Sequence, residues 1–223
     1  PLIERVANAP QPDRSVIEGE FPVGLQRELT EKIISVMDID RRYLTVGETE
    51  HPFTTSFTKK DTRITTHYYE SDVASSLYSV IHEGGHALYD MNSDDSLFGS
   101  SLEGGVSMGI HESQSRFYEN IIGRSLPFCE VLLPILRGTF PGRFDKACAE
   151  DIYRAVNRSQ PSLIRTEADE LTYSLHIMIR YELEKMMFDG VITAHDLPHE
   201  WNRLYKEYLG IDVPDDKHGV LQD

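Results

Sequence analysis

The feature that most constrains this chain is the sequence His82-Glu83-Gly84-Gly85-His86, which lies in a stretch of helical periodicity. Because an α-helix brings residues four apart onto one face, the two imidazoles would stand one turn apart on the same side. Imidazoles in that arrangement can each give a nitrogen to one metal ion. The intervening glutamate lies close enough to reach a metal-bound water without being placed as a third ligand. The spacing is therefore that of a zinc peptidase, with two ligands and a general base on one helix.

A catalytic zinc site uses three protein ligands and keeps one position open, so the chain must return another side chain to the metal. Glu112 lies far enough along for a loop and part of an antiparallel helix to bring it back. His111 is the rival ligand, and a solvated helix surface is the plain alternative for both. Asp90 lies one turn beyond His86, where its carboxylate would accept the second N–H of a ligand imidazole. An ordinary surface aspartate at the helix end explains Asp90 equally well.

Composition indicates a soluble globular protein. The 223 residues are 39% hydrophobic and 26% charged, as is usual for a globular domain. The formal net charge of −15 leaves no basic stripe for a phosphate backbone, so no nucleic-acid partner is expected. No apolar run approaches the roughly 20 residues that span a membrane, and no signal peptide opens the chain. Cys129 and Cys148 stand in apolar, helix-like surroundings and are predicted to be reduced core thiols, as in a cytoplasmic protein.

Hydrophobic periodicity predicts a mainly helical chain with one small β-hairpin beside the motif helix. Residues 1–20 are polar and predicted to be loose, and residues 38–50 are charged and predicted to form a loop. Two stretches rich in threonine and aromatic residues, 53–58 and 62–68, predict the strands of the hairpin. Helices are predicted at 23–38, 72–91, 106–122, from 127 onward, 145–158, 162–189 and 196–209.

Two adjacent glycines interrupt the motif helix. Each glycine in a helix interior costs about 1 kcal/mol relative to alanine. Gly84 and Gly85 are therefore expected to leave space, either for the backbone of a substrate or for a closely packed helix.

The zinc motif is one of six short blocks that follow one another along most of the chain. The blocks are His51-Pro52-Phe53, Asp61-Thr62-Arg63-Ile64-Thr65, the stretch from His82 to His86, His111-Glu112-Ser113-Gln114, Ile164-Arg165-Thr166-Glu167-Ala168-Asp169 and Gly219-Val220-Leu221-Gln222-Asp223. In this order they resemble the signature blocks of the thermostable-carboxypeptidase family of metallopeptidases, also called the Taq carboxypeptidase or M32 family. Six ordered blocks are far more specific than one zinc-binding motif.

The resemblance implies a mostly helical, gluzincin-like peptidase that removes single residues from the C-termini of peptides and commonly forms a homodimer. It implies that His82, His86 and Glu112 hold zinc or cobalt and that Glu83 is the general base. Family members are considerably longer than this chain. We therefore interpret residues 1–223 as a single, central catalytic portion that lacks N-terminal helices and a C-terminal segment, and we expect it alone to be much less active than its parent.

The family-like blocks also suggest substrate contacts. His51 is favoured over His67 as a donor to the oxyanion, with a structural hydrogen bond as the alternative for either. Arg63 and Arg165 are assigned to the substrate carboxylate, because arginine binds that group bidentately. An ion pair with neighbouring acidic residues is the alternative for each arginine. The strand edge around Ile64 is expected to pair with the substrate backbone.

The main hypothesis is therefore a metal-dependent carboxypeptidase that hydrolyses the C-terminal peptide bond of peptide substrates. An endopeptidase or dipeptidase on a similar scaffold would share the metal motif but lack a carboxylate clamp, and an amidated substrate separates the two. The third hypothesis is an inactive portion that serves only as a folding or dimer module. Metal content together with turnover separates that one.

Overall fold

The computed structural model describes residues 2–222, which form two compact units. One unit comprises Asp13–Val156. The other joins the described residues up to Pro12 with those from Asn157 onward. Each unit has a hydrophobic core of its own, and the zinc motif lies in the first.

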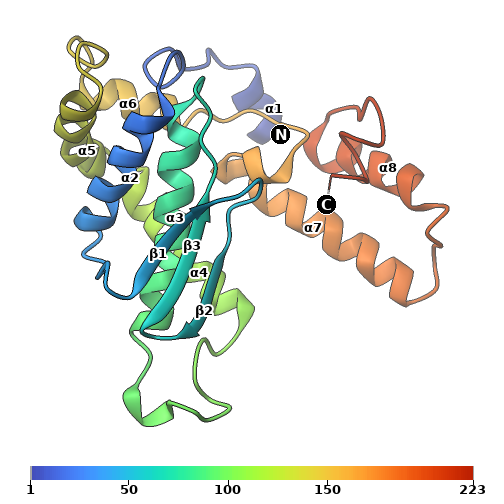
Figure 1. Cartoon of the computed structure of the whole chain (residues 1–223). Helices are drawn as coiled ribbons and strands as arrows, with labels where there is room; N and C mark the ends of the chain where they lie inside the picture. Colours follow the sequence, from blue (N-terminus) through green and yellow to red (C-terminus); the bar gives the residue numbers. More distant parts are fainter. Residues whose placement is uncertain (1, 223) are drawn as a thin grey trace. The chain divides into compact units, whose positions relative to one another are not determined.

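The first unit is mainly helical, with a small sheet lying along one helix (Figure 1). Its apolar core draws on several helices, through side chains such as Ile33, Val80 and Leu132. The helical elements of this unit are α2 (Val23–Val36), α3 (Val73–Met91), the 3₁₀ segment η1 (Asp95–Leu97), α4 (Met108–Arg116), the π-helical segment η2 (Phe117–Gly123), α5 (Leu126–Thr139) and α6 (Ala149–Val156).

The sheet has three strands in the order β1-β3-β2. β2 (Thr54–Thr58) and β3 (Asp61–Thr66) pair antiparallel and form the predicted hairpin. β1 (Leu44–Glu48) pairs with β3 in parallel, so the prediction of a loop throughout 38–50 is wrong. Only Leu44 of this strand is buried. The strand is short and charged residues flank it, so the sequence shows no clear alternation of apolar and polar residues there.

β3 is the central strand, so it has no free edge around Ile64. Ile64 is aligned with Val46 of β1 on one side and with Thr54 of β2 on the other. The expectation that a substrate backbone pairs at this edge is therefore wrong, because both sides of the strand are already occupied.

α3 organises the first unit and matches the predicted helix at 72–91. Asp72 caps it, because its carboxylate accepts the backbone N–H groups of Ala74 and Ser75. Those donors have no partner within the first helical turn, so the cap stabilises the start of the helix. Leu77 and Val80 lie on its buried face, and α2 and β3 both pack against the helix.

The second unit contains a pair of long helices. Its elements are α1 (Leu2–Ala7), the 3₁₀ segment η3 (Arg165–Glu167), α7 (Glu170–Phe188) and α8 (Leu197–Leu209). Ile179 and Leu183 of α7 pack with Trp201 and Leu204 of α8 to form its core. α8 agrees with the helix predicted at 196–209.

Two boundary predictions in the second unit are wrong. α1 lies within the region predicted to be loose, and its 6 residues are too few for a periodic pattern to stand out. α7 begins well after residue 162, because Asp169 caps it by accepting the N–H groups of Leu171 and Thr172. The residues before the cap form η3 and an extended stretch instead.

Both cysteines are free thiols, as predicted. Cys129 is buried in α5, but Cys148 is exposed, so its predicted place in the core is wrong. Cys148 directly precedes α6, where its backbone N–H donates to the carboxylate of Asp151 at the surface. Across residues 2–222, each helix is too short or too polar to cross a membrane.

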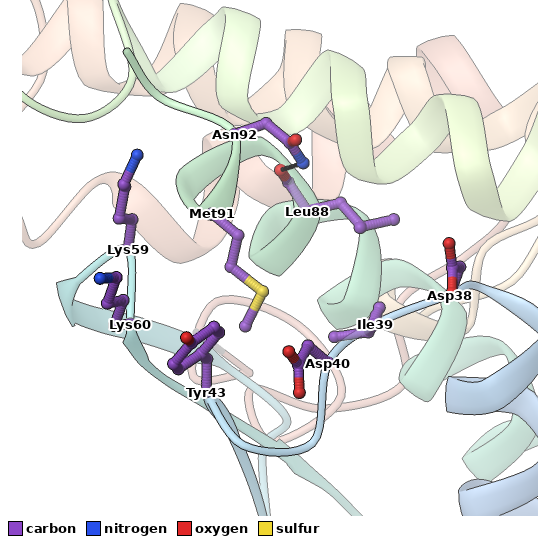
Figure 2. A pocket seen from close by; sticks show the side chains of 9 residues that line it. All are labelled: Asp38, Ile39, Asp40, Tyr43, Lys59, Lys60, Leu88, Met91 and Asn92. Carbon is purple, nitrogen blue, oxygen red and sulfur yellow. Dashed lines mark hydrogen bonds between the residues drawn. The ribbon is translucent and has the colours of Figure 1, made fainter. Parts of the chain in front are cut away.

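A hollow of about 220 Å³ lies beside the C-terminal end of α3. Figure 2 shows Met91 pointing from that helix toward Tyr43 and Asp40. The hollow is lined by Asp38, Ile39, Asp40, Tyr43, Lys59, Lys60, Leu88, Met91 and Asn92. None of these lining residues belongs to the zinc motif, so the hollow is separate from the site described next.

Candidate metal centre

His82 and His86 of α3 converge with Glu112 of α4. The Oε2 atom of Glu112 lies 3.5 Å from Nε2 of His82 and 3.3 Å from Nε2 of His86. One ligand atom from each of the three residues lies within 4.8 Å of the others. Ligand atoms bound to one tetrahedral metal at roughly 2.0–2.1 Å stand about 3.3 Å apart. The spacing therefore fits a single metal ion, with His82, His86 and Glu112 as the side chains that would hold it.

Gly85 allows α3 and α4 to approach closely enough to form this cluster. A Cβ atom on Gly85 would lie 2.8 Å from Cα of Ser115 and 3.1 Å from the carbonyl oxygen of Gln114. A Cβ atom on Gly84 would instead lie 2.7 Å from the end of the Met37 side chain. Of the two predicted reasons for the paired glycines, the closely packed helix applies to Gly85.

We expect Gly85→Ala to lower the free energy of unfolding by about 1–3 kcal/mol, because the new methyl group meets backbone that must shift. Gly138→Ala in α5 is the matched control, since nothing lies within 4 Å of its added Cβ. That control is expected to raise the free energy of unfolding by about 0.5–1 kcal/mol. Denaturant unfolding of both variants tests this, and a neutral Gly85→Ala would contradict the close helix contact.

The second ring nitrogen of His82 is held by a buried glutamate. Nδ1 of His82 lies 2.9 Å from Oε2 of Glu119. The same oxygen lies 3.3 Å from Nη1 of Arg116, and the other carboxylate oxygen, Oε1, lies 2.8 Å from Nη2 of Arg124. Burial favours the neutral acid, but the hydrogen bond with His82 and the charge of Arg124 lower the pKa of Glu119 below its ordinary value. An ionised Glu119 accepts the Nδ1–H of His82, so Nε2, on the side of Glu112, is the nitrogen that can bind a metal when the ring is neutral.

Glu119 was not predicted from the sequence, although a signal for it exists. It lies two helical turns beyond Glu112 in a stretch predicted to be one helix, and a regular helix would place both carboxylates on one face. Its segment is π-helical, a geometry that is often found near functional sites.

The second ring nitrogen of His86 contacts another histidine. Nδ1 of His86 lies 2.7 Å from Nδ1 of His111, and Nε2 of His111 lies 2.9 Å from Oδ1 of Asp90. Asp90 therefore reaches the ring of His86 through His111 and not directly. Because both nitrogens of His111 are engaged in these bonds, the geometry favours Glu112 over its rival as the third ligand.

The carboxylate of Glu83 lies between α3 and the sheet. Glu83 is 6% exposed, and its Oε2 accepts a 2.5 Å hydrogen bond from Oγ1 of Thr54. Ser56, two residues further along β2, donates to Oδ2 of Asp90 at 2.6 Å. Neither hydroxyl was predicted to contact α3, although alternate residues of a strand face the same side.

The charges of the cluster favour a bound cation. Burial alone would raise the pKa of Glu112, but hydrogen bonds with His82 and His86 lower it below its ordinary value. Burial opposes protonation of His82, but the carboxylates of Glu112 and Glu119 raise its pKa above the ordinary value. The carboxylate of Glu112 therefore stabilises positive charge where the ligand atoms converge, and that of Glu119 stabilises positive charge on the His82 ring from its other nitrogen.

His51 and His67, the two histidines considered as oxyanion donors, form no hydrogen bond with the residues of this cluster in the part of the chain that the structure describes. His51 is exposed in the loop between β1 and β2, and its carbonyl accepts from the hydroxyl of Thr49. Nδ1 of His67 lies 3.1 Å from the carbonyl oxygen of Thr49. Within residues 2–222, no hydrogen bond joins either ring to His82, His86 or Glu112.

The two arginines assigned to the substrate carboxylate have different surroundings. Arg63 is exposed on β3, where Nε and Nη2 each lie 3.0 Å from an oxygen of Asp61, and its guanidinium stacks 4.7 Å from the ring centre of Phe57. The ion-pair alternative therefore describes Arg63. Arg165 lies in η3 of the second unit, where its backbone N–H donates to Gln222 and its Nη1 lies 3.5 Å from the hydroxyl of Tyr173.

The family model described as Carboxypeptidase Taq (M32) metallopeptidase matches residues 1–223. The chain belongs to this family. Membership confirms the resemblance that was drawn from the six sequence blocks, and it agrees with the prediction of a mainly helical fold. M32 metallopeptidases use a divalent metal.

Two curated M32 relatives match over the whole chain. The chain is 45% identical over 224 residues to Carboxypeptidase 1 of Bacillus subtilis and 40% identical over 223 residues to Thermostable carboxypeptidase 1 of Thermus thermophilus. It covers 45% and 44% of these relatives, so it spans less than half of their length.

A solved M32 structure has the same fold over the full chain. The M32 carboxypeptidase from Deinococcus radiodurans R1 superposes with a TM-score of 0.95 at 42% sequence identity. The match covers 100% of this chain and 45% of that chain.

Proposed function

We propose that this chain supplies the metal ligands and the general base of a metal-dependent carboxypeptidase that hydrolyses the C-terminal peptide bond of peptides. The observation that carries the proposal is the convergence of two Nε2 atoms, from His82 and His86, on one carboxylate oxygen of Glu112. Membership of the M32 family supports peptides as the substrate class.

His82, His86 and Glu112 would hold a divalent metal, which supplies Lewis acidity and lowers the pKa of a bound water when present. Glu83 accepts the proton of the attacking water and delivers it to the leaving amine. Its burial and the hydrogen bond from Thr54 support this role, because together they fix the carboxylate in one orientation.

Zinc is the metal we propose, because two histidines and one glutamate with an open fourth position form a donor set typical of catalytic zinc. Cobalt as a substitute and assembly as a homodimer rest on the family resemblance. The experiment is removal of the metal with a chelator, followed by addition of zinc or cobalt. Hydrolysis of a peptide with a free C-terminus is expected to disappear and then return, and hydrolysis that survives complete metal removal would overturn the proposal.

Arg165 is proposed to bind the terminal carboxylate of the substrate. Arg63 is the weaker candidate, because its guanidinium is already bound at two points to Asp61. An arginine–carboxylate pair is worth a few kcal/mol when one partner is removed, since the other is left unpaired. Arg165→Ala in the active enzyme is therefore expected to lower kcat/KM about 10²-fold on free peptides and little on amidated ones.

Arg165→Lys is the conservative control and is expected to restore activity only in part, because an ammonium group cannot bind a carboxylate as a planar fork. The melting temperature is measured on the same variants. Equal losses on free and amidated peptides, together with a lower melting temperature, would show that Arg165 has a structural role only.

A further inference from the structure

The two histidines of the proposed metal site have chemically different partners at Nδ1. His82 faces the carboxylate of Glu119 at 2.9 Å, whereas His86 faces the imidazole of His111 at 2.7 Å. A carboxylate only accepts hydrogen bonds, so Glu119 fixes the tautomer of His82 directly. An imidazole nitrogen either donates or accepts, so another group must set the direction of the bond between His86 and His111.

Asp90 sets that direction. Its Oδ1 lies 2.9 Å from Nε2 of His111, and its Oδ2 accepts from the hydroxyl of Ser56 at 2.6 Å. Because the carboxylate accepts, Nε2 of His111 carries the proton, and the Nδ1 of neutral His111 then presents a lone pair. His86 must therefore donate from Nδ1, so its Nε2, 3.3 Å from Oε2 of Glu112, is the nitrogen that can bind a metal when the ring is neutral.

We infer that His111 is a positioning residue that holds His86 in its metal-binding tautomer. This inference rests on the proposed metal site. His111 comes from α4, Asp90 from α3 and Ser56 from β2, so the contacts tie the orientation of one ligand ring to three elements. The side chains of His86, His111 and Asp90 are only 16%, 19% and 14% exposed, so little water competes for these bonds.

Zinc affinity of two substitutions at position 111 tests the inference. His111→Phe keeps a planar ring but removes both nitrogen atoms, and it is expected to weaken zinc binding roughly 10- to 100-fold. His111→Gln offers an amide oxygen to His86 and an N–H to Asp90, and it is expected to recover most of the loss. Affinity is measured by competition with a chromophoric chelator, and the visible spectrum of the cobalt-loaded protein reports the ligand geometry.

Tyr89→Phe is the matched control in the same neighbourhood. The Tyr89 ring lies 5.0 Å from the His111 ring, and its hydroxyl accepts from the backbone N–H of Val106 at 3.4 Å, away from the ligands. This variant is expected to bind zinc like the unmutated protein. The melting temperatures of the metal-free variants show whether any loss of affinity reflects unfolding.

Two results would overturn the inference alone. Unchanged zinc affinity and an unchanged cobalt spectrum in His111→Phe would remove His111 from the support of the site. Equal losses in the Phe and Gln variants, with equally lowered melting temperatures, would assign His111 a structural role. His82→Ala separates the inference from the proposed function, because zinc binding that survives this change would overturn the metal site and the inference together.

Discussion

Replacement of Glu83 with glutamine is expected to abolish peptide hydrolysis while metal binding persists. The amide has nearly the same size and still offers an oxygen to the hydroxyl of Thr54, which now donates to Oε2 of Glu83 at 2.5 Å. It cannot accept a proton from the attacking water or deliver one to the leaving amine. Because one residue serves both steps, we expect kcat to fall roughly 10²- to 10⁴-fold.

The control for Glu83→Gln is Glu130→Gln, which makes the same change at an exposed position of α5. Both variants are analysed for bound metal and for turnover of the same peptide. Full metal occupancy with lost turnover supports Glu83 as a base that does not bind the metal. Retention of more than about a tenth of the activity would require a different base.

The local features of the candidate site were predictable from the sequence. The spacing of His82 and His86 within a helical pattern places both rings on one face, and Asp72 marks the start of that helix. The position of Glu112 on a following helix made it a candidate third ligand, with His111 as its rival, and the family resemblance favoured Glu112. These inferences depend on contacts within one helix, or on a single antiparallel return, which a hydrophobic pattern determines well.

The support around these ligands was not predictable in the same way. Thr54 and Ser56 contact α3 because β2 presents one face to the helix, and a sequence pattern does not say which face that is. The role of His111 depends on which of its nitrogens faces His86, a question of ring orientation and not of spacing. β1 was missed because its pairing with β3 is parallel and non-local, and only Leu44 is buried.

Loss of the third proposed ligand is expected to affect zinc binding more than any change in the surrounding network. Apparent zinc-binding free energies of about 10–16 kcal/mol in zinc-finger peptides, whose sites have four ligands, imply several kcal/mol for each ligand. Glu112→Ala is therefore expected to weaken zinc binding roughly 10³-fold, since about 1.4 kcal/mol corresponds to a factor of ten. Glu112→Gln keeps an oxygen ligand without the charge, so its affinity is expected to be intermediate.

Glu130→Ala is the matched control for Glu112→Ala, because it removes an exposed carboxylate from the same unit without touching the cluster. Competition with a chelator gives the zinc affinity of each variant, and metal analysis gives the stoichiometry. The order of losses is the sharpest part of the prediction, with Glu112→Ala exceeding His111→Phe by about tenfold or more. If Glu112→Ala kept full zinc affinity while His111→Phe lost it, His111 and not Glu112 would be the third ligand. The His111 ring, which faces His86 and Asp90 in this structure, would then have to turn toward the metal.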